Sequence, residues 1–474
     1  MKKIIIALCI FFVCSKGFSQ WQPETQLTNN PSSSLTTLNS VASSGNTVHT
    51  VWSDNRDGNT EIYYKRSTDA GITWGTDTRL TNASDYSLRP SITVSGVTVH
   101  VVWYDNRDGN TEIYYKRSTD AGSSWSADTR LTVNTDISQD PSLAVSGTTV
   151  YVVWIDLRNA GFDLFLKKST DNGVNWGPDT PLSSNGGPGE YTPVISVSGS
   201  IVHVAWQDNR NSSTGEVYYK RSADNGVNFG PDIRLTNDPA SSNYVSISST
   251  GTNVNIVWLD TRTGQSEIFY KRSTDSGASW GTDTRLTMNG FSSGNPSVSS
   301  AGSNIHVVYS GNSGIYYKRS TDGGNTWSSD LRLSDIVSFA RDPSIAISGS
   351  AIHVIWHDAR SSDEEVYYER NPTGNPTAIL PVNSIIPKNF SLGQNFPNPF
   401  NPETKIKFDI PAASFTTLKI YSIQGNEVVS LLNNRMSAGS YEVEWNAANY
   451  PSGVYFYKLV SGDFNKTIKM ILMK

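Results

Sequence analysis

The sequence predicts an all-β fold built from repeated four-stranded sheets, and three observations carry this prediction. An eight-residue signature, Ser-x-Asp-x-Gly-x-x-Trp or a near match, recurs six times at intervals of roughly 50 residues. Between the copies lie short runs rich in β-branched and aromatic residues, bounded by Gly, Asn, Asp or Ser, which is typical of strands. No window of this region has the helical 3.6-residue period. A fixed period of this length with four strands per repeat predicts a β-propeller.

The second repeat shows the unit in order. Its four runs cover residues 90–96, 97–103, 112–118 and 128–132, and the signature joins the third run to the fourth. In the signature, the Asp is expected to accept backbone N–H groups of its own turn, the Gly to take a positive φ and the Trp to pack beneath the turn. We interpret the six aspartates as scaffold, because an active site is usually present once. They are Asp69, Asp120, Asp171, Asp224, Asp275 and Asp322.

The repeats predict seven blades, of which the last needs a strand from elsewhere in the chain. Second strands that end in an aromatic residue occur seven times, but only six fourth strands follow them. Residues 21–28 have the layout of residues 74–81, which contain a fourth strand. We therefore expect the N-terminal segment to supply the outer strand of the last blade, which would remove two exposed sheet edges.

Two further repeated features are interpreted as structural. An Asp-x-Arg motif follows the second strand in six blades, as in Asp54-Asn55-Arg56, and we expect ion pairs and turn hydrogen bonds between neighbouring blades. Five of the six histidines share one position in the second strand, where the other two blades have Tyr151 and Asn255. Because two blades lack the histidine, no metal site is expected there, and no motif for a cofactor is present.

The N-terminus predicts export. Met1-Lys2-Lys3 is followed by an apolar run that ends at Cys14, which is too short to cross a membrane, so residues 1–19 are predicted to be a secretory signal peptide. Both cysteines lie in this segment, and no disulfide is expected in the mature chain. The net charge of −5 is dispersed, which argues against binding of nucleic acid or an anionic membrane. We expect a monomer with no membrane span in the mature chain.

The pattern changes after the repeats. Residues 20–371 are assigned to the propeller, and residues 372–388 contain prolines typical of a semi-rigid linker. Residues 389–474 show a series of short strands that predicts a small immunoglobulin-like β-sandwich.

Three segments of this tail closely resemble the C-terminal sorting domain of type IX secretion cargo. They are 392–402 (LGQNFPNPFNP), 418–425 (LKIYSIQG) and 453–459 (GVYFYKL). The resemblance implies export across the outer membrane by the type IX machinery, which becomes the expected partner. It also implies a protein that is secreted or attached to the outer cell surface of a bacterium with an outer membrane. The alternative is an ordinary adhesive sandwich domain.

The six signatures resemble the Asp-box (BNR) repeats of the sialidase-like propeller superfamily over residues 21–371. The resemblance is specific for the fold, but many propellers with such boxes have no catalytic activity, so the function has to be argued from the site.

A ligand site is expected on the face opposite to the Asp boxes. In a four-stranded meander the loops that enter the first strands lie on that face, around the mouth of the channel, and their residues differ from blade to blade. The alternative is a solvated rim with no dedicated ligand. The ligand-binding candidates are Arg89, Asp140, Glu190, Tyr191, Tyr244, Asn295, Arg341, Asp342 and, as the one histidine outside the repeated position, His357.

Two functions remain open at this stage. The first is a non-catalytic recognition or adhesion module for glycan or another extracellular polymer. The second, implied by the resemblance, is a sialidase-like exo-glycosidase acting on an acidic sugar, with Arg89 and Arg341 as carboxylate clamp and Asp140 as acid. The nucleophile would be Tyr191 or Tyr244 beside Glu190. Against the enzyme, no third unique arginine is apparent, and the comparable enzymes have six blades.

Overall fold

The computed structural model describes residues 21–158, 161–183, 190–210, 214–335, 339–360, 363–372, 380–383, 387–412, 414–436, 438–447 and 450–474. The predicted signal peptide and most of the predicted linker lie outside the described residues. The described residues form strands and no helix, which confirms the all-β prediction. The chain divides into a repeat unit, Pro23–Arg370, and a second unit that contains Asn371–Lys474.

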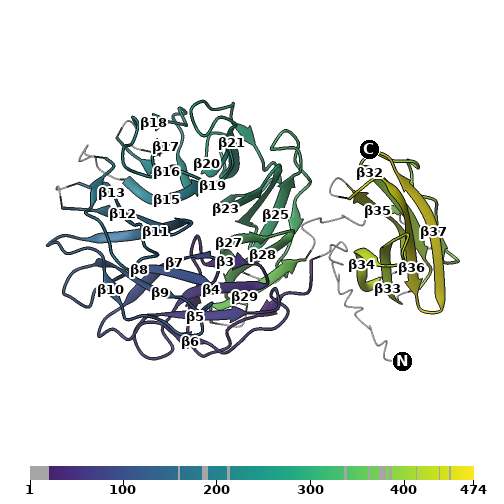
Figure 1. The fold of residues 1–474 in the computed structure, drawn as a ribbon, viewed down its shortest axis with the longest axis horizontal. Helices are drawn as coiled ribbons and strands as arrows, with labels where there is room; N and C mark the ends of the chain where they lie inside the picture. The colour runs from purple at the N-terminus through teal and green to yellow at the C-terminus, as the bar shows by residue number, and fades with distance from the viewer. Residues whose placement is uncertain are drawn as a thin grey trace, which may run out of the picture. The chain divides into compact units, whose positions relative to one another are not determined.

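The described residues of the repeat unit form seven sheets around a central axis (Figure 1). The first has β2 (Ser34–Leu35), β3 (Val41–Ser44), β4 (Thr47–Asp54), β5 (Glu61–Ser67) and β6 (Thr78–Arg79). The second and third have β7 (Ser87–Ser95), β8 (Thr98–Asp105), β9 (Glu112–Ser118) and β10 (Thr129–Arg130), then β11 (Ser138–Ser146), β12 (Thr149–Asp156), β13 (Asp163–Ser169) and β14 (Thr180–Pro181).

The remaining sheets repeat the same order. The fourth and fifth have β15 (Glu190–Ser198), β16 (Ile201–Asp208), β17 (Glu216–Ser222) and β18 (Ile233–Arg234), then β19 (Ser242–Thr250), β20 (Asn253–Asp260), β21 (Glu267–Ser273) and β22 (Thr284–Arg285). The sixth has β23 (Ser293–Ala301), β24 (Asn304–Gly311), β25 (Gly314–Ser320) and β26 (Leu331–Arg332). The last has β27 (Arg341–Ser348), β28 (Ala351–Asp358), β29 (Glu365–Asn371) and the N-terminal β1 (Thr25–Gln26).

The ring is closed by the two ends of the repeat unit. Strand β1 pairs antiparallel with β29, with Thr25 opposite Tyr368. The Leu27 N–H donates to the Val366 carbonyl at 2.7 Å, and the Val366 N–H donates to Thr28 Oγ1 at 2.8 Å. The innermost strands contact one another around the circle, and β27 contacts β3. The N-terminal strand therefore completes the last blade, as the sequence predicts.

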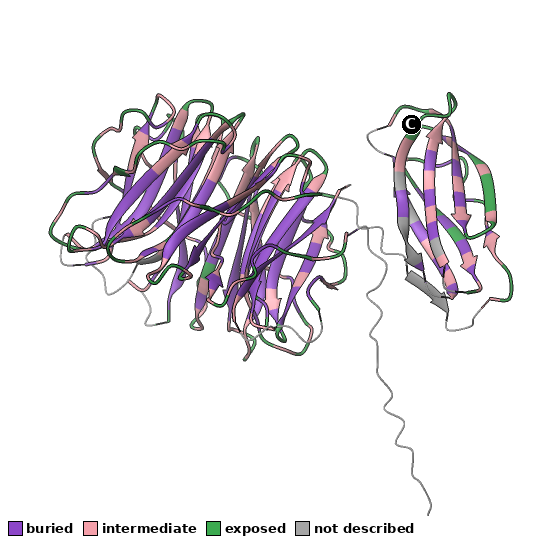
Figure 2. Ribbon diagram, turned by 90° about the horizontal axis from the view of Figure 1, so that it is seen from below, coloured by how far each residue is buried: buried purple, intermediate pink, exposed green. Residues whose placement is uncertain are grey.

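Neighbouring blades are joined by aromatic residues of the repeat. The Tyr64 ring of the first blade packs edge-on against Trp125 of the second blade's Asp box, with 4.9 Å between ring centroids. The sequence placed this Trp beneath its own turn, and the structure adds a contact with the preceding blade that the sequence did not predict. Figure 2 shows that the strands are largely buried and that exposed residues gather in the loops.

The Asp-x-Arg motif acts within a blade, so the expected pairing between blades is wrong. The Arg56 side chain contacts Asp54 at 2.5 Å and Asp77 at 2.6 Å. Asp54 ends β4 and Asp77 directly precedes β6, so both carboxylates belong to the first blade, as Arg56 does. Its guanidinium also lies 4.5 Å above the Tyr63 ring. Asp54 is fully buried, and a buried carboxylate needs its charged partner close by.

The second unit contains two four-stranded sheets. One has the order β30 (Leu380–Asn383), β35 (Gly439–Asn446), β32 (Glu403–Ile410) and β31 (Ser391–Leu392). The other has the order β34 (Glu427–Met436), β33 (Ser414–Ser422), β36 (Gly453–Ser461) and β37 (Phe464–Leu472). Buried side chains of both sheets form one apolar core, including Phe408, Leu418 and Trp445. The immunoglobulin-like topology of this unit stays a prediction.

Candidate functional site at the channel mouth

A cavity of about 590 Å³ lies where the innermost strands of the blades begin. Most of its lining residues come from β7, β11, β15, β19, β23 and β27 and from the segment between β2 and β3, and others come from β2, β4, β8, β28 and the residue before β29. The Asp boxes follow the third strands and lie at the opposite ends of the sheets, where the Ala121 N–H donates to the Val97 carbonyl of the β7–β8 turn. The cavity is therefore on the face that the sequence predicts.

In six blades the innermost strand is interrupted at the same place by a β-bulge. In β7 the register shifts between Leu88 and Ser91, and Arg89 lies in the bulge with φ +51°. A bulge turns a side chain out of the regular alternation of the strand. A non-glycine residue with a left-handed backbone is energetically unfavourable, and such residues are often found at functional sites. Every one of these residues lines the cavity: Arg89, Asp140, Thr192, Tyr244, Asn295 and Asp342.

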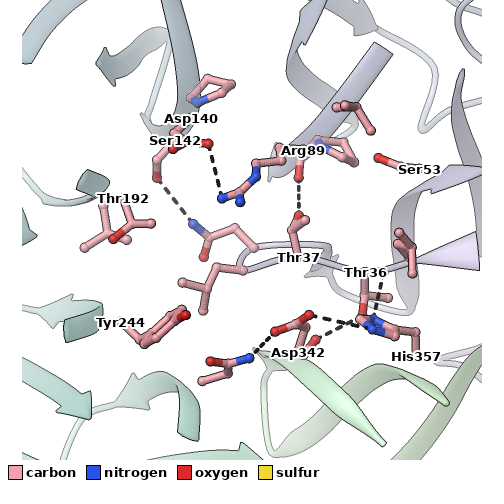
Figure 3. Close-up of a pocket in the computed structure, with 18 of the residues that line it drawn as sticks. Thr36, Thr37, Ser53, Arg89, Asp140, Ser142, Thr192, Tyr244, Asp342 and His357 are labelled. Atoms are coloured by element: carbon pink, nitrogen blue, oxygen red, sulfur yellow. Dashed lines mark hydrogen bonds and ion pairs between the residues drawn. The ribbon is translucent and has the colours of Figure 1, made fainter. Parts of the chain in front are cut away.

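The first blade departs from this pattern. Ser34 and Ser40 are six positions apart, whereas their counterparts Ser87 and Ser91 are four apart. The longer connection carries Thr36, Thr37 and Asn39 across the cavity, as Figure 3 shows for the two threonines.

This connection is tied to three other blades. Thr37 Oγ1 donates to the Pro90 carbonyl of the second blade at 2.8 Å, and Asn39 Nδ2 donates to Ser142 Oγ of the third at 3.3 Å. The Ser40 N–H donates to Ser344 Oγ of the seventh at 3.1 Å. The segment 36–40 is thus anchored to the second, third and seventh blades.

One half of the cavity is organised around an ion pair. Arg89 Nη1 lies 3.2 Å from Asp140 Oδ1, with the arginine side chain 53% exposed and the carboxylate only 16% exposed. Burial raises the pKa of Asp140, and the charge of Arg89 opposes that rise. Burial also raises the pKa of Tyr104, which lines the cavity beside them. An exposed guanidinium held by a partly buried carboxylate is positioned to donate hydrogen bonds to a ligand.

The other half contains His357 beside two carboxylates. His357 Nδ1 accepts a hydrogen bond from the Thr36 backbone N–H at 3.2 Å, which assigns the proton of the neutral ring to Nε2. Nε2 lies 3.7 Å from Asp342 Oδ2 and 4.0 Å from Glu364 Oε1. Burial, with a smaller effect of Arg341, lowers the pKa of His357 to about 3. The ring is therefore neutral at pH 7.

Asp342 occupies the bulge of the seventh blade and accepts a hydrogen bond from Asn295 Nδ2 of the sixth. Burial raises the pKa of Asp342, while Asn295 and the charges of Arg341 and Arg89 oppose the rise. Arg341 also lies 3.8 Å from Glu364, with 55% of its side chain exposed. Figure 3 shows Asp342 and His357 on the opposite side of Thr37 from Asp140.

The structure brings most of the predicted site residues to one cavity. Arg89, Asp140, Tyr244, Asn295, Arg341, Asp342 and His357 line it. Glu190 and Tyr191 begin β15, but their side chains lie outside the described residues, and Thr192 is the residue at the bulge.

Sequence reasoning missed Asn39, Thr192 and Glu364. A following proline marks the bulge in five blades, as in Thr192-Pro193 and Asp342-Pro343, and this spacing could have identified Thr192.

The residues proposed for a sialidase-like reaction are only partly assembled. Arg89 is paired with Asp140, so the expected acid and one expected clamp residue bind each other. Tyr244 lines the cavity and is 44% exposed. Within the described part of the chain no carboxylate contacts its hydroxyl.

Two family models match the chain. A BNR repeat-like domain matches residues 53–254, and a secretion system C-terminal sorting domain matches residues 394–473. The chain therefore contains a BNR repeat-like domain within the propeller and a type IX sorting domain at its C-terminus. The sorting domain marks the protein for secretion or for attachment to the outer cell surface. No helix in the described ranges is long and apolar enough to cross a membrane.

No curated protein matches this BNR propeller protein significantly. Among solved structures, it is similar to the polysaccharide lyase Uly1, with 10% identity, a TM-score of 0.53, and coverage of 74% of this chain and 99% of that chain. It also matches Trypanosoma rangeli sialidase, with 11% identity, a TM-score of 0.43, and coverage of 83% and 85%. The likeness to Uly1 is one of fold.

Proposed function

We propose that this extracellular propeller is a non-catalytic recognition module that binds glycan in the channel-mouth cavity. One observation carries the proposal. The six equivalent bulge positions share one backbone conformation but have five different residue types, and only Asp140 and Asp342 are the same. Scaffold positions of this chain repeat their residue types from blade to blade, as the Asp boxes do. Variation over a constant backbone is what a ligand site with its own specificity needs.

The chemistry of the lining supports a saccharide. Arg89 and Asn295 supply donors, Asp140 and Asp342 supply acceptors, and Tyr244 offers an exposed ring face. Sugar hydroxyls both donate and accept hydrogen bonds, and their C–H faces pack on aromatic rings. The volume of about 590 Å³ falls in the range of roughly 300–1,000 Å³ usual for small-molecule sites.

An exo-glycosidase is the second candidate, and one observation favours it. Burial raises the pKa of both Asp140 and Asp342, and a general acid needs a carboxyl that stays protonated above its ordinary pKa. The pairing of Asp140 with Arg89 works against this role, because a nearby cation favours the ionised carboxylate.

A glycan array with the purified full-length protein tests the proposal, followed by titration of each hit. We expect Arg89→Ala and Tyr244→Ala each to weaken binding by about tenfold or more, the effect of a residue central to a binding site. Val227→Ala is the matched control, since Val227 is 61% exposed on the Asp-box side. Absence of any glycan binding by the wild type would contradict the proposal.

Fluorogenic glycosides distinguish the two candidates. A binder gives no turnover above that of a blank without protein, whereas an enzyme gives equal turnover in the wild type and in Val227→Ala. Turnover that Asp140→Asn abolishes, with unchanged thermal stability, would instead establish the enzyme.

A further inference from the structure

The second unit exposes an aromatic residue on a loop that is itself firmly held. The loop 394–400 joins β31 to β32. Phe396 is 79% exposed, whereas Leu392 and Phe400 on either side of it are 3% and 2% exposed and belong to the apolar core. The residues 397–399 that follow Phe396 are exposed as well, and two of them are prolines. The loop thus presents a short apolar surface.

Buried hydrogen bonds fix the backbone beneath this surface. Asn395 is 2% exposed; its N–H donates to Tyr457 Oη at 2.8 Å and its Nδ2 donates to Thr404 Oγ1 at 2.8 Å. Tyr457 Oη in turn donates to the Gly393 carbonyl at 2.7 Å. The side chains of Asn395 and Thr404 both donate to the Pro397 carbonyl, at 3.0 Å and 2.8 Å.

The backbone of the loop is also paired on both sides. The Phe396 N–H and carbonyl bond to Lys405 of β32 at 2.9 Å each, and the Phe400 N–H donates to the Ile471 carbonyl of β37 at 3.0 Å. Asn398 Oδ1 accepts the Ile471 N–H at 2.9 Å. The loop is therefore anchored to both sheets of the unit.

The fold itself does not account for Phe396. The Phe396 side chain is 79% exposed. It therefore buries little apolar surface and contributes little to the folding free energy of the unit. A rigid loop that presents an aromatic side chain loses little conformational entropy on binding, which favours its use as an anchor in an apolar pocket.

We propose that the loop 394–400, through Phe396, docks into an apolar pocket of the type IX secretion machinery. The match of residues 394–473 to a secretion sorting domain identifies the partner, because this unit is the part of the chain that the machinery handles. The inference concerns export and is independent of the ligand of the propeller.

Export of the full chain tests the docking. Phe396→Ser and Ile423→Ser are expressed in a bacterium that has the pathway, and the protein outside the cells is measured against the protein retained in the periplasm. Ile423 is the matched control, since it is an exposed apolar residue of the same unit, 66% accessible, in a different turn. We expect Phe396→Ser to lower the exported fraction by about tenfold, as for a central anchor residue, and Ile423→Ser to leave it unchanged.

The outcomes separate docking from folding and from other occupants. Equal export of the two variants would overturn the proposal. If Phe396→Ser lowers the thermal stability of the purified chain, Phe396→Trp provides the second variant, because it keeps an aromatic anchor. Stable Phe396→Trp protein that is not exported would also overturn it. Dimers of the full chain that Phe396→Ser dissociates would assign the loop to a second copy instead.

Discussion

The hydroxyl group of Tyr64 in the first blade occupies the space in which a side chain on Gly122 of the second blade would begin. Gly122 has φ +81° and is the glycine of an Asp box. The same contact recurs around the ring, and at Gly71 it is made by Tyr368, which joins the last blade to the first. The glycine of the signature is thus fixed by its own turn and by the blade before it.

Gly122→Ala should destabilise the propeller by about 3 kcal/mol, because a left-handed alanine and a clash with a buried ring both add to the loss. Gly96→Ala is the control: Gly96 has φ +60° but nothing within 4 Å of its added Cβ, so about 1 kcal/mol is expected from the backbone alone. Urea unfolding of both variants measures the difference. Equal losses would show that the contact between blades has no energetic weight.

Removal of residues 20–29 should lower the melting temperature by roughly 5–10 °C, because the last blade loses β1 and its hydrogen bonds. Thr25 and Gln26 have exposed side chains. The double variant Thr25→Ala/Gln26→Ala therefore keeps the backbone pairing and should have the melting temperature of the wild type. Differential scanning calorimetry makes the comparison. A truncated protein that melts at the wild-type temperature would contradict the closure.

Lowering the pH from 6.5 toward 4 should destabilise the propeller. Burial, with a smaller effect of nearby arginines, lowers the pKa of His49, His100, His203 and His353 to about 4. The unfolded chain therefore binds more protons in this range, and stability is lost as the pH falls. Each histidine contributes up to about 1.4 kcal/mol per pH unit.

One blade supplies the matched variant for that experiment. In the fifth blade Asn255 replaces the histidine and accepts the Tyr270 hydroxyl at 2.7 Å, as His100 Nδ1 pairs with the Tyr115 hydroxyl at 2.7 Å. His100→Asn should keep the hydrogen bond and remove about one proton from the pH dependence of unfolding. Urea unfolding between pH 7 and pH 4.5 gives the slope; an unchanged slope would exclude His100 as a contributor.

Arg56→Lys should destabilise the first blade by about 1–3 kcal/mol, because lysine cannot make the bidentate contact to buried Asp54 and stack on Tyr63 at once. Asp77→Asn is the comparison, since the Asp77 side chain is 20% exposed and the loss of its charge should cost less. Unfolding free energies in urea rank the two variants. If Asp77→Asn lost more unfolding free energy than Arg56→Lys, the contact of Arg56 with Asp77 would be the more stabilising one.

The fold could be predicted from the sequence because the evidence for it is local. The signature is a short motif, and residues 21–28 can be compared directly with residues 74–81, which contain a fourth strand. The packing partner of Trp125 was missed, because no local pattern states which blade an aromatic ring faces. The site was found only approximately for a similar reason. In the fourth blade the sequence analysis named Glu190 and Tyr191, whose side chains lie outside the described residues, and did not name Thr192, the bulge residue that lines the cavity. Asn39 was missed because its segment has two extra residues and leaves the repeat altogether.

The bond between Thr28 and Val366 spans 338 positions of the chain. The first strand to leave the ribosome therefore has no partner until almost the whole repeat unit has been made. Until then the nascent repeat unit cannot close its ring, although the sheets built from consecutive strands already have all their partners. Completion of the circle is therefore a late event that requires synthesis to pass Tyr368.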